Sequence, residues 1–324
     1  MARARSVMIW LAVAVVVAAT AAAYGAAVWP WMAPPATDAA VLEARWADVV
    51  RRADTFGPAV ARSLELEAAT DAIASQWDAA GDMLHGDAPA AAVERPPALT
   101  PAIEALVRWS EAGAVVPDLC MNNDVPAVRL ARLADVALYT ADRPDAAFVA
   151  VLRLAQGLRR RGALLGGIVG FSMAQKAAET AQRRGWRGAE VEAELRRYRP
   201  TEEELRAVVA RESVCSYRLV ESSFGADCER SDPGMRAPWY VPMTASRWCA
   251  REKAIVREHF GALHAGAAAE KDLRRFADAL AVPDGAAARS LILEALTTPL
   301  GGTTLRMVEA LAGYEVALVG VSAA

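Results

Sequence analysis

One uncharged apolar segment near the N-terminus constrains this chain more than any other feature of its sequence. The segment, Val7–Val28, follows Arg3 and Arg5. It is about 22 residues long, close to the roughly 20 that a helix needs to cross a bilayer. No basic residue follows until Arg45, so the positive-inside rule keeps the short N-terminus in the cytoplasm and exports the rest. We therefore predict a membrane anchor at residues 1–31.

Cleavage as a signal peptide is the alternative for this segment. It would have an apolar core at Val7–Ala19 and a small-residue cleavage site at Ala21–Ala23. Apolar character continues beyond that site, which favours the anchor. A lipid anchor is excluded, because it needs a cysteine directly after the apolar core and the first cysteine is Cys120. In both interpretations the chain beyond a proline-rich stalk at 32–38 lies outside the cytoplasm.

The composition predicts an all-α fold. Hydrophobic residues reach 54% but aromatic residues only 6%, and the surplus is mostly alanine, the best helix former and a poor strand residue. Only three of the 36 basic residues are lysines; this alanine and arginine bias is typical of a high-GC bacterial genome. A net charge of −3 argues against a nucleic-acid surface. We predict a single-pass protein of the bacterial inner membrane, with a helical domain at 39–324 in the periplasm or elsewhere outside the cytoplasm.

Helical periodicity divides that domain into an irregular array of antiparallel hairpins. The clearest pair lies at 129–162, where two apolar faces flank the turn at Asp142–Pro144. Thr201 and Glu204 mark a strong helix start. Further helices are expected from Ala39, at Ala59–Leu84, from Thr100, at Leu164–Ala174, from Ala245, at Gly285–Leu296 and at Thr303–Val319. The buried faces are expected to include Leu205, Val208, Val209, Cys215 and Leu219; Cys249, Val256, Phe260 and Leu263; and Leu305, Val308, Ala312, Val316 and Val319.

Two clusters on these helices have alternative interpretations. Gly166, Gly167 and Gly170 interrupt an apolar run; we interpret them as close helix packing, with a ligand site as the alternative. The run is too short to span a membrane. Arg159–Arg161 stands at a helix end, where cations complement the helix dipole. The alternative for these arginines is an anionic lipid or polymer.

The four cysteines predict two disulfides. Exported proteins occupy oxidising compartments, and an even number of cysteines is typical of a disulfide framework. The helix faces favour Cys215–Cys249 with Cys120–Cys228, and the alternative pairs Cys215 with Cys228 and Cys120 with Cys249. A zinc site is disfavoured, because the sequence has no Cys-x-x-Cys pair.

Two resemblances follow from these segments. Leu133-Ala134, Ala141-Asp142 and Asp145-Ala146 make the hairpin at about 129–162 resemble, loosely, a tetratricopeptide unit, without a second copy. The whole chain resembles a group of uncharacterised single-pass proteins of high-GC bacteria, in which an anchor precedes an alanine- and arginine-rich helical ectodomain. The residues that carry this likeness are Leu130–Leu133, Val151–Ala155, Leu164–Gly170 and Pro299–Gly301. The resemblance implies no catalytic activity.

The sequence predicts neither a catalytic residue, nor a metal site, nor a cofactor. It contains no nucleophile elbow, His-Glu-x-x-His or Walker pattern. His259 with Ser246 would be the nearest base and nucleophile, but they lie more than three helical turns apart.

We therefore expect a non-enzymatic, membrane-anchored envelope protein that serves as a helical binding or scaffold module for a protein or peptide. The irregular stretch 224–248 is the candidate surface, because aromatic and arginine side chains are enriched at binding hot spots. The alternative for that stretch is a loop whose aromatics pack on the domain. An extracytoplasmic, hydrolase-like enzyme is the alternative function, and self-association through Ala18, Ala22 and Ala26 is a third. The candidate binding residues are Arg230, Arg236, Trp239, Tyr240, Arg247 and Trp248.

Overall fold

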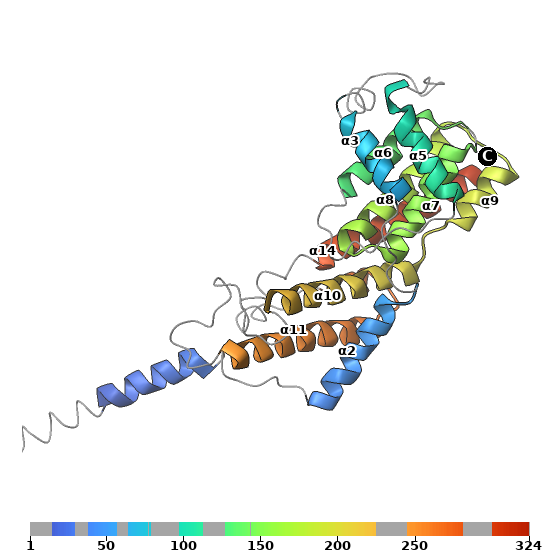
Figure 1. Ribbon diagram of the computed structural model, residues 1–324. Coiled ribbons are helices and arrows are strands. Elements are labelled where there is room, and N and C mark those ends of the chain that lie inside the picture. Colours follow the sequence, from blue (N-terminus) through green and yellow to red (C-terminus); the bar gives the residue numbers. More distant parts are fainter. Residues whose placement is uncertain are drawn as a thin grey trace, which may run out of the picture. The chain divides into compact units, whose positions relative to one another are not determined.

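The computed structural model describes residues 15–29, 38–56, 64–76, 78, 97–112, 127–142, 144–224, 245–280 and 300–323. These residues form helices joined by turns, and no strand occurs among them (Figure 1). The predicted all-α fold is therefore confirmed for this part of the chain. The expected helix at Gly285–Leu296 lies outside the described residues.

The helices follow the sequence signals closely at their N-termini. α5 begins at Thr100 with a proline in its first turn, and α10 begins directly after Thr201. Asp145 caps α7 by accepting from the Phe148 N–H at 2.9 Å, which fixes the turn of the predicted α6–α7 hairpin. The labelled elements are α2 (Ala39–Ala53), α3 (Leu64–Ser75), the 3₁₀ turn η1 (Pro97–Leu99), α5 (Thr100–Glu111), α6 (Ala127–Thr140), α7 (Ala146–Arg161), α8 (Leu164–Arg183), α9 (Ala189–Arg197), α10 (Glu202–Phe224), α11 (Ala245–Ala268), α12 (Leu273–Ala279) and α14 (Leu300–Ser322).

The predicted anchor is described only over residues 15–29, which are helical. Within the described residues, none of the helices combines the length and the apolar character that crossing a membrane requires. Residues 7–14, the first part of the predicted span, lie outside the described ranges.

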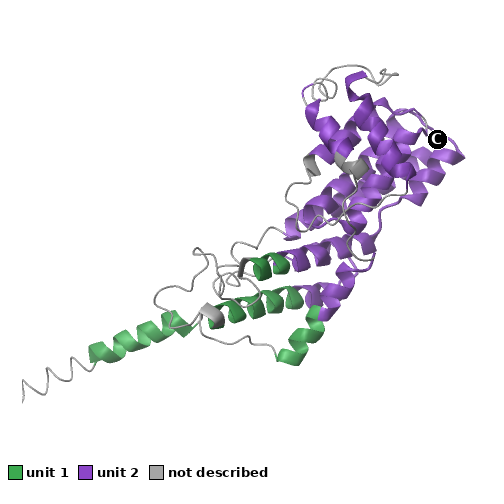
Figure 2. Ribbon diagram, viewed as in Figure 1, with its two compact units in different colours: residues 1–46, 217–262, 282–298 green, residues 47–216, 263–281, 299–324 purple. Residues whose placement is uncertain are grey.

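The chain packs as two units (Figure 2). The first comprises residues 1–46, 217–262 and 282–298; the second comprises 47–216, 263–281 and 299–324. In the first unit, Arg257 of α11 lies 5.7 Å from the ring centroids of both Trp46 and Tyr217. Its guanidinium also donates to Glu43 at 2.5 Å, so a cation–π stack and an ion pair join α2, α10 and α11.

The second unit is built around α8, which packs against α6, α7 and α14. A Cβ at Gly170 would stand 2.7 Å from the carbonyl oxygen of Ala155 in α7, and one at Gly167 would overlap the Val208 side chain of α10. Glycine is needed at both places because the neighbouring helices come too close for any side chain. The interpretation of this run as close helix packing is confirmed.

The same constraint aligns α8 with α14. A Cβ at Gly313 or Gly320 would overlap the amide of Gln175 or Gln182, respectively. Each pair of positions is seven residues apart, which is about two helical turns. The residue numbers increase in the same direction along both helices, so α8 and α14 run parallel.

Four predicted buried positions are wrong, one on α10 and three on α14. The side chain of Leu219, near the end of α10, is exposed. The predicted face of α14 is also wrong, because Ala312, Val316 and Val319 are exposed. This helix is apolar nearly all round, so periodicity could not select a face; the bulkier Met307 and Tyr314 occupy the core instead.

Candidate functional site

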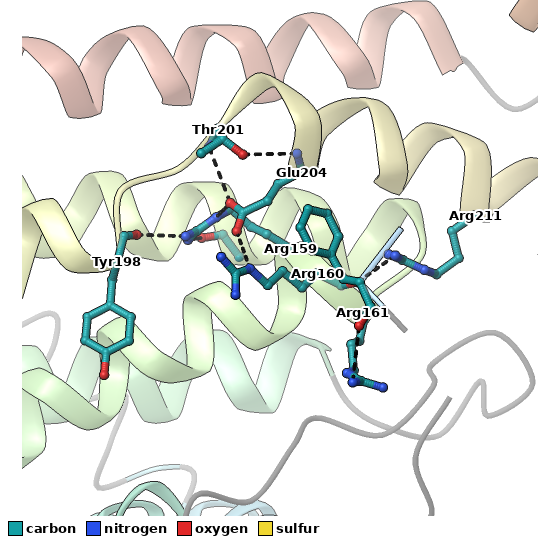
Figure 3. A network of polar contacts seen from close by, with 9 residues as sticks. Arg159, Arg160, Arg161, Tyr198, Thr201, Glu204 and Arg211 are labelled. Carbon is teal, nitrogen blue, oxygen red and sulfur yellow. Dashed lines mark hydrogen bonds and ion pairs between the residues drawn. The ribbon is translucent and has the colours of Figure 1, made fainter. Parts of the chain in front are cut away.

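A buried ion-pair network joins the end of α7 to the start of α10 (Figure 3). Arg159 and Glu204 are both fully buried. Arg159 Nε donates to Glu204 Oε2 at 2.7 Å, and Arg160 Nε donates to Oε1 at 2.8 Å. Each carboxylate oxygen therefore has its own guanidinium donor, one of them buried and the other half-exposed.

The remaining donors of Arg159 point to the backbone. Its Nη2 donates to the Tyr198 carbonyl at 2.8 Å and its Nη1 to the Gly170 carbonyl at 3.4 Å (Figure 3). Burial lowers the pKa of Arg159, and the Glu204 carboxylate opposes that shift. A buried charge is tolerated only with such partners, so Arg159 and Glu204 hold the two helices together.

Glu204 also completes the start of α10. Its backbone N–H donates to Thr201 Oγ1 at 3.2 Å, and its Oε2 accepts from the Thr201 N–H at 3.3 Å. This reciprocal pair is the capping box that the Thr-x-x-Glu spacing predicts. One carboxylate therefore serves as helix cap and as partner of two arginines.

The third arginine of the cluster has an internal acceptor too. Arg161 Nη2 donates to the Phe56 carbonyl at 3.3 Å, while the Arg160 guanidinium lies 5.2 Å from the centre of the Phe56 ring. These contacts favour a structural role for the arginine cluster over the binding of an anionic lipid or polymer, because each guanidinium already has a partner within the chain.

Two consecutive residues of α10 close the tight α7–α8 junction. Arg211 donates to the Gly162 carbonyl at 2.7 Å and to the Arg160 carbonyl, at the end of α7. Glu212 Oε2 accepts from the Leu164 N–H at 2.9 Å, at the start of α8. A cation thus meets the negative end of one helix dipole and an anion the positive end of the next.

A buried serine–histidine pair lies farther along α10. Ser213 Oγ is 2.9 Å from His264 Nε2, and both side chains are buried. Burial lowers the pKa of His264 to about 4. The distance suits a nucleophile and its base, but such a weak base, shielded from solvent, is a poor proton acceptor near neutral pH.

Sequence reasoning missed this pair. Ser213 lies four residues after Val209, and His264 four residues after Phe260, and both reference positions were predicted to be buried. The helix faces therefore carried the signal that each side chain is buried. Their contact depends on how α10 and α11 dock, which spacing does not give.

Most of the predicted binding residues lie outside the described ranges. Arg247 is exposed on α11, whereas Trp248 is buried with 3% of its surface exposed, and the Arg251 guanidinium lies 5.5 Å from its ring centre. Trp248 therefore packs inside the protein and is not available to a partner at the surface. The residues outside the description are Arg230, Arg236, Trp239 and Tyr240.

The two described cysteines, Cys215 and Cys249, are disulfide-bonded and buried. Cys120 and Cys228 lie outside the described residues, so the pairing stays a prediction.

His259 contacts the ring of Phe260 edge-on at 5.6 Å between centroids, and burial lowers its pKa. The Ser246 side chain lies outside the description, so the disfavoured pairing of this histidine with that serine is not tested. Among the described residues, no group of three or more histidine, cysteine or carboxylate side chains could hold a metal ion.

Comparison of the chain with protein-family models, with curated proteins and with solved structures found no match.

Proposed function

We propose that this chain is a non-enzymatic protein of the bacterial cell envelope, anchored in the inner membrane, that presents a helical binding or scaffold module outside the cytoplasm. One observation carries the proposal. Val15, Val16 and Val17 expose more than 60% of their surface on the helix at 15–29. Exposed apolar side chains in a row favour a lipid environment. Residues 7–14, which carry no charge, supply the further length that a span needs.

The chemistry of the described interior supports a role without catalysis. Arg159, Glu204 and Arg211 are buried and bond to one another's helices or to helix ends. Groups held in this way stabilise the array and are not free to bind or activate a substrate.

A reporter fusion tests the location. Alkaline phosphatase fused after Ala324 folds only where disulfides form, so we expect activity from the full chain. Arginines at Val15 and Val17 should abolish that activity, because two charges in the apolar segment block insertion. Arginine at Val41, an exposed valine of α2, is the matched control and should change nothing. Activity confined to a cytoplasmic reporter would refute the proposed location.

A photo-crosslinker tests the binding role. Placed at Arg247, it stands at the described end of the predicted surface; placed at Arg306, an exposed residue of α14, it provides the control. We expect a discrete adduct in intact cells from the first position and none from the second. Equal labelling at both would argue against a dedicated surface at 224–248.

Ser213 and His264 favour a second candidate function, a hydrolase, since their 2.9 Å separation is that of a catalytic pair. A fluorophosphonate probe decides between the two. The binding role predicts no Ser213 adduct, because this hydroxyl is fully buried. Labelling that disappears in Ser213→Ala would support the enzyme instead.

A further inference from the structure

Three helices far apart in the sequence meet around His264. Its imidazole, on the last turns of α11, contacts Ser213 of α10. The charged groups that act on it are Arg52 and Asp48, both on α2. Asp48 itself accepts from Arg52 Nε at 2.8 Å and from Arg51. The histidine therefore has an uncharged hydrogen-bond partner, and the two charged groups that act on it are already paired with each other.

The hydrogen bonds favour a neutral ring. Ser213 Oγ lies 3.3 Å from the Val209 carbonyl, one turn earlier in α10, and donates to it. His264 Nε2–H then donates to Ser213 Oγ, which leaves Nδ1 without a hydrogen. Within the described residues, Ser213 is the hydrogen-bond partner that the structure gives His264. A second proton would sit on Nδ1 in the buried interior, with Arg52 nearby.

From this arrangement we propose that Ser213 and His264 form an acid-sensitive latch: protonation of His264 releases the end of α11 from α10. The inference goes beyond the proposed function and does not depend on it. The proposed location outside the cytoplasm would expose the latch to the pH of the surroundings.

The direction of the effect follows from proton linkage. Burial, then Arg52, lowers the pKa of His264 from 6.5 to about 4, and Asp48 opposes the shift. Above pH 6.5 the ring is neutral in both states and has no effect. Between pH 6.5 and 4 the open state binds the proton more readily, so the closed state loses stability as the pH falls. From pH 7.5 to pH 5.0, these values shift the closing equilibrium about 30-fold toward the open state.

Amide hydrogen exchange of the purified full-length chain in detergent tests the latch. After correction for intrinsic exchange rates, we expect peptides covering 209–216 and 263–268 to lose about 30-fold protection between pH 7.5 and pH 5.0. Peptides from α6 and α7 are the internal control and should keep theirs. An equal loss in α6 and α7 would mean global unfolding and would overturn the proposal, as would unchanged protection at 209–216 and 263–268.

Two variants separate His264 from other titrating groups. His264→Gln keeps an N–H donor for Ser213 without a titratable ring, and should abolish the pH effect. His259→Gln, on the same helix, should keep the full effect. If His264→Gln fails to fold, NMR titration of the wild-type ring decides. A His264 signal that stays neutral down to pH 5 in the closed state supports the latch, and one that titrates near pH 6.5 overturns it.

Discussion

At the scale of single residues, Glu204 combines a helix-capping role with an ion-pairing role. It caps α10 through Thr201 and pairs with both Arg159 and Arg160. Replacing a buried ion pair as a whole by apolar groups can be neutral, but removing one partner leaves the other charge uncompensated. Glu204 therefore stabilises the α7–α10 contact together with Arg211, which donates to carbonyls at the end of α7.

Glu204→Gln should destabilise the protein by about 3–5 kcal/mol, because Arg159 would keep its charge without a buried counter-ion. Chemical denaturation followed by circular dichroism measures the loss. Glu203→Gln, an exposed neighbour on the same turn, should change stability by less than about 0.5 kcal/mol. Similar small effects from both variants would contradict the assigned role.

Two glycines should respond in opposite ways to substitution by alanine. Gly167→Ala should cost about 1–3 kcal/mol, because its new Cβ would overlap the branched Val208 side chain. At Gly266, in α11, an added Cβ would meet nothing within 4 Å. Gly266→Ala should therefore stabilise by about 0.5–1 kcal/mol through helix propensity. Thermal melting of the two variants should move in opposite directions, and a shared direction would show that packing at Gly167 is looser than described.

At the scale of helices, arginines repeatedly close C-termini. Arg184 donates to the Ala141 carbonyl at 2.6 Å and to that of Tyr139, at the end of α6. Arg206 donates to the Glu270 carbonyl at 2.7 Å, just after α11. With Arg211 at the end of α7, these side chains satisfy carbonyls that a helix end leaves unpaired. The arginine bias of the composition thus has a structural use in this fold.

Arg211→Gln should destabilise the second unit by about 1–3 kcal/mol, because buried carbonyls at the end of α7 would lose their donor. The same denaturation experiment applies to this variant. Arg218→Gln, at an exposed site on the same helix, is the control and should stay within about 0.5 kcal/mol of the parent. If the Arg211 variant were as stable as this control, water would have to replace the guanidinium at the junction.

The end of α8 shows how a local signal fixes an element. Gly185 has a φ of 62°, in the left-handed region that glycine favours. The N–H of Trp186 bonds to the Ala181 carbonyl at 2.9 Å and that of Gly185 to the Gln182 carbonyl at 3.0 Å. These two bonds form a Schellman motif, which ends the helix and turns the chain toward α9.

At the scale of the whole molecule, disulfides constrain the chain. The Ser213–His264 contact does not fit the favoured Cys215–Cys249 bridge, because His264 lies fifteen residues, about 22 Å, along α11 from Cys249. We therefore expect a non-reducing peptide map to show the alternative pairing, Cys215 joined to Cys228 and Cys120 to Cys249. Each bridge should add roughly 3–4 kcal/mol to stability, in the entropic model, by constraining the unfolded chain. Reduction should lower the melting temperature accordingly. Recovery of Cys215 joined to Cys249 would contradict the described docking of Ser213 on His264, and four free thiols from exported protein would remove the expected bridges altogether.

Much of the architecture was predictable because it depends on neighbours in the chain. The capping box at Thr201 and Glu204, the cap at Asp145 and the α6–α7 hairpin each involve residues a few positions apart. The candidate sites were harder to predict from the sequence. The sequence marked Arg159 as a helix-end cation, but its ion-pair partner lies 45 residues away on another helix.

The sequence by itself determined that this chain is helical and where many of its helices begin, because propensity, caps and glycine spacing act within one or two turns. Only the tertiary structure decided which face of α14 is buried, which carboxylate neutralises Arg159 and that Ser213 meets His264. These outcomes depend on the rotation and separation of packed helices. That rotation and separation are set by the side chains of several elements together, and no single stretch of sequence contains them.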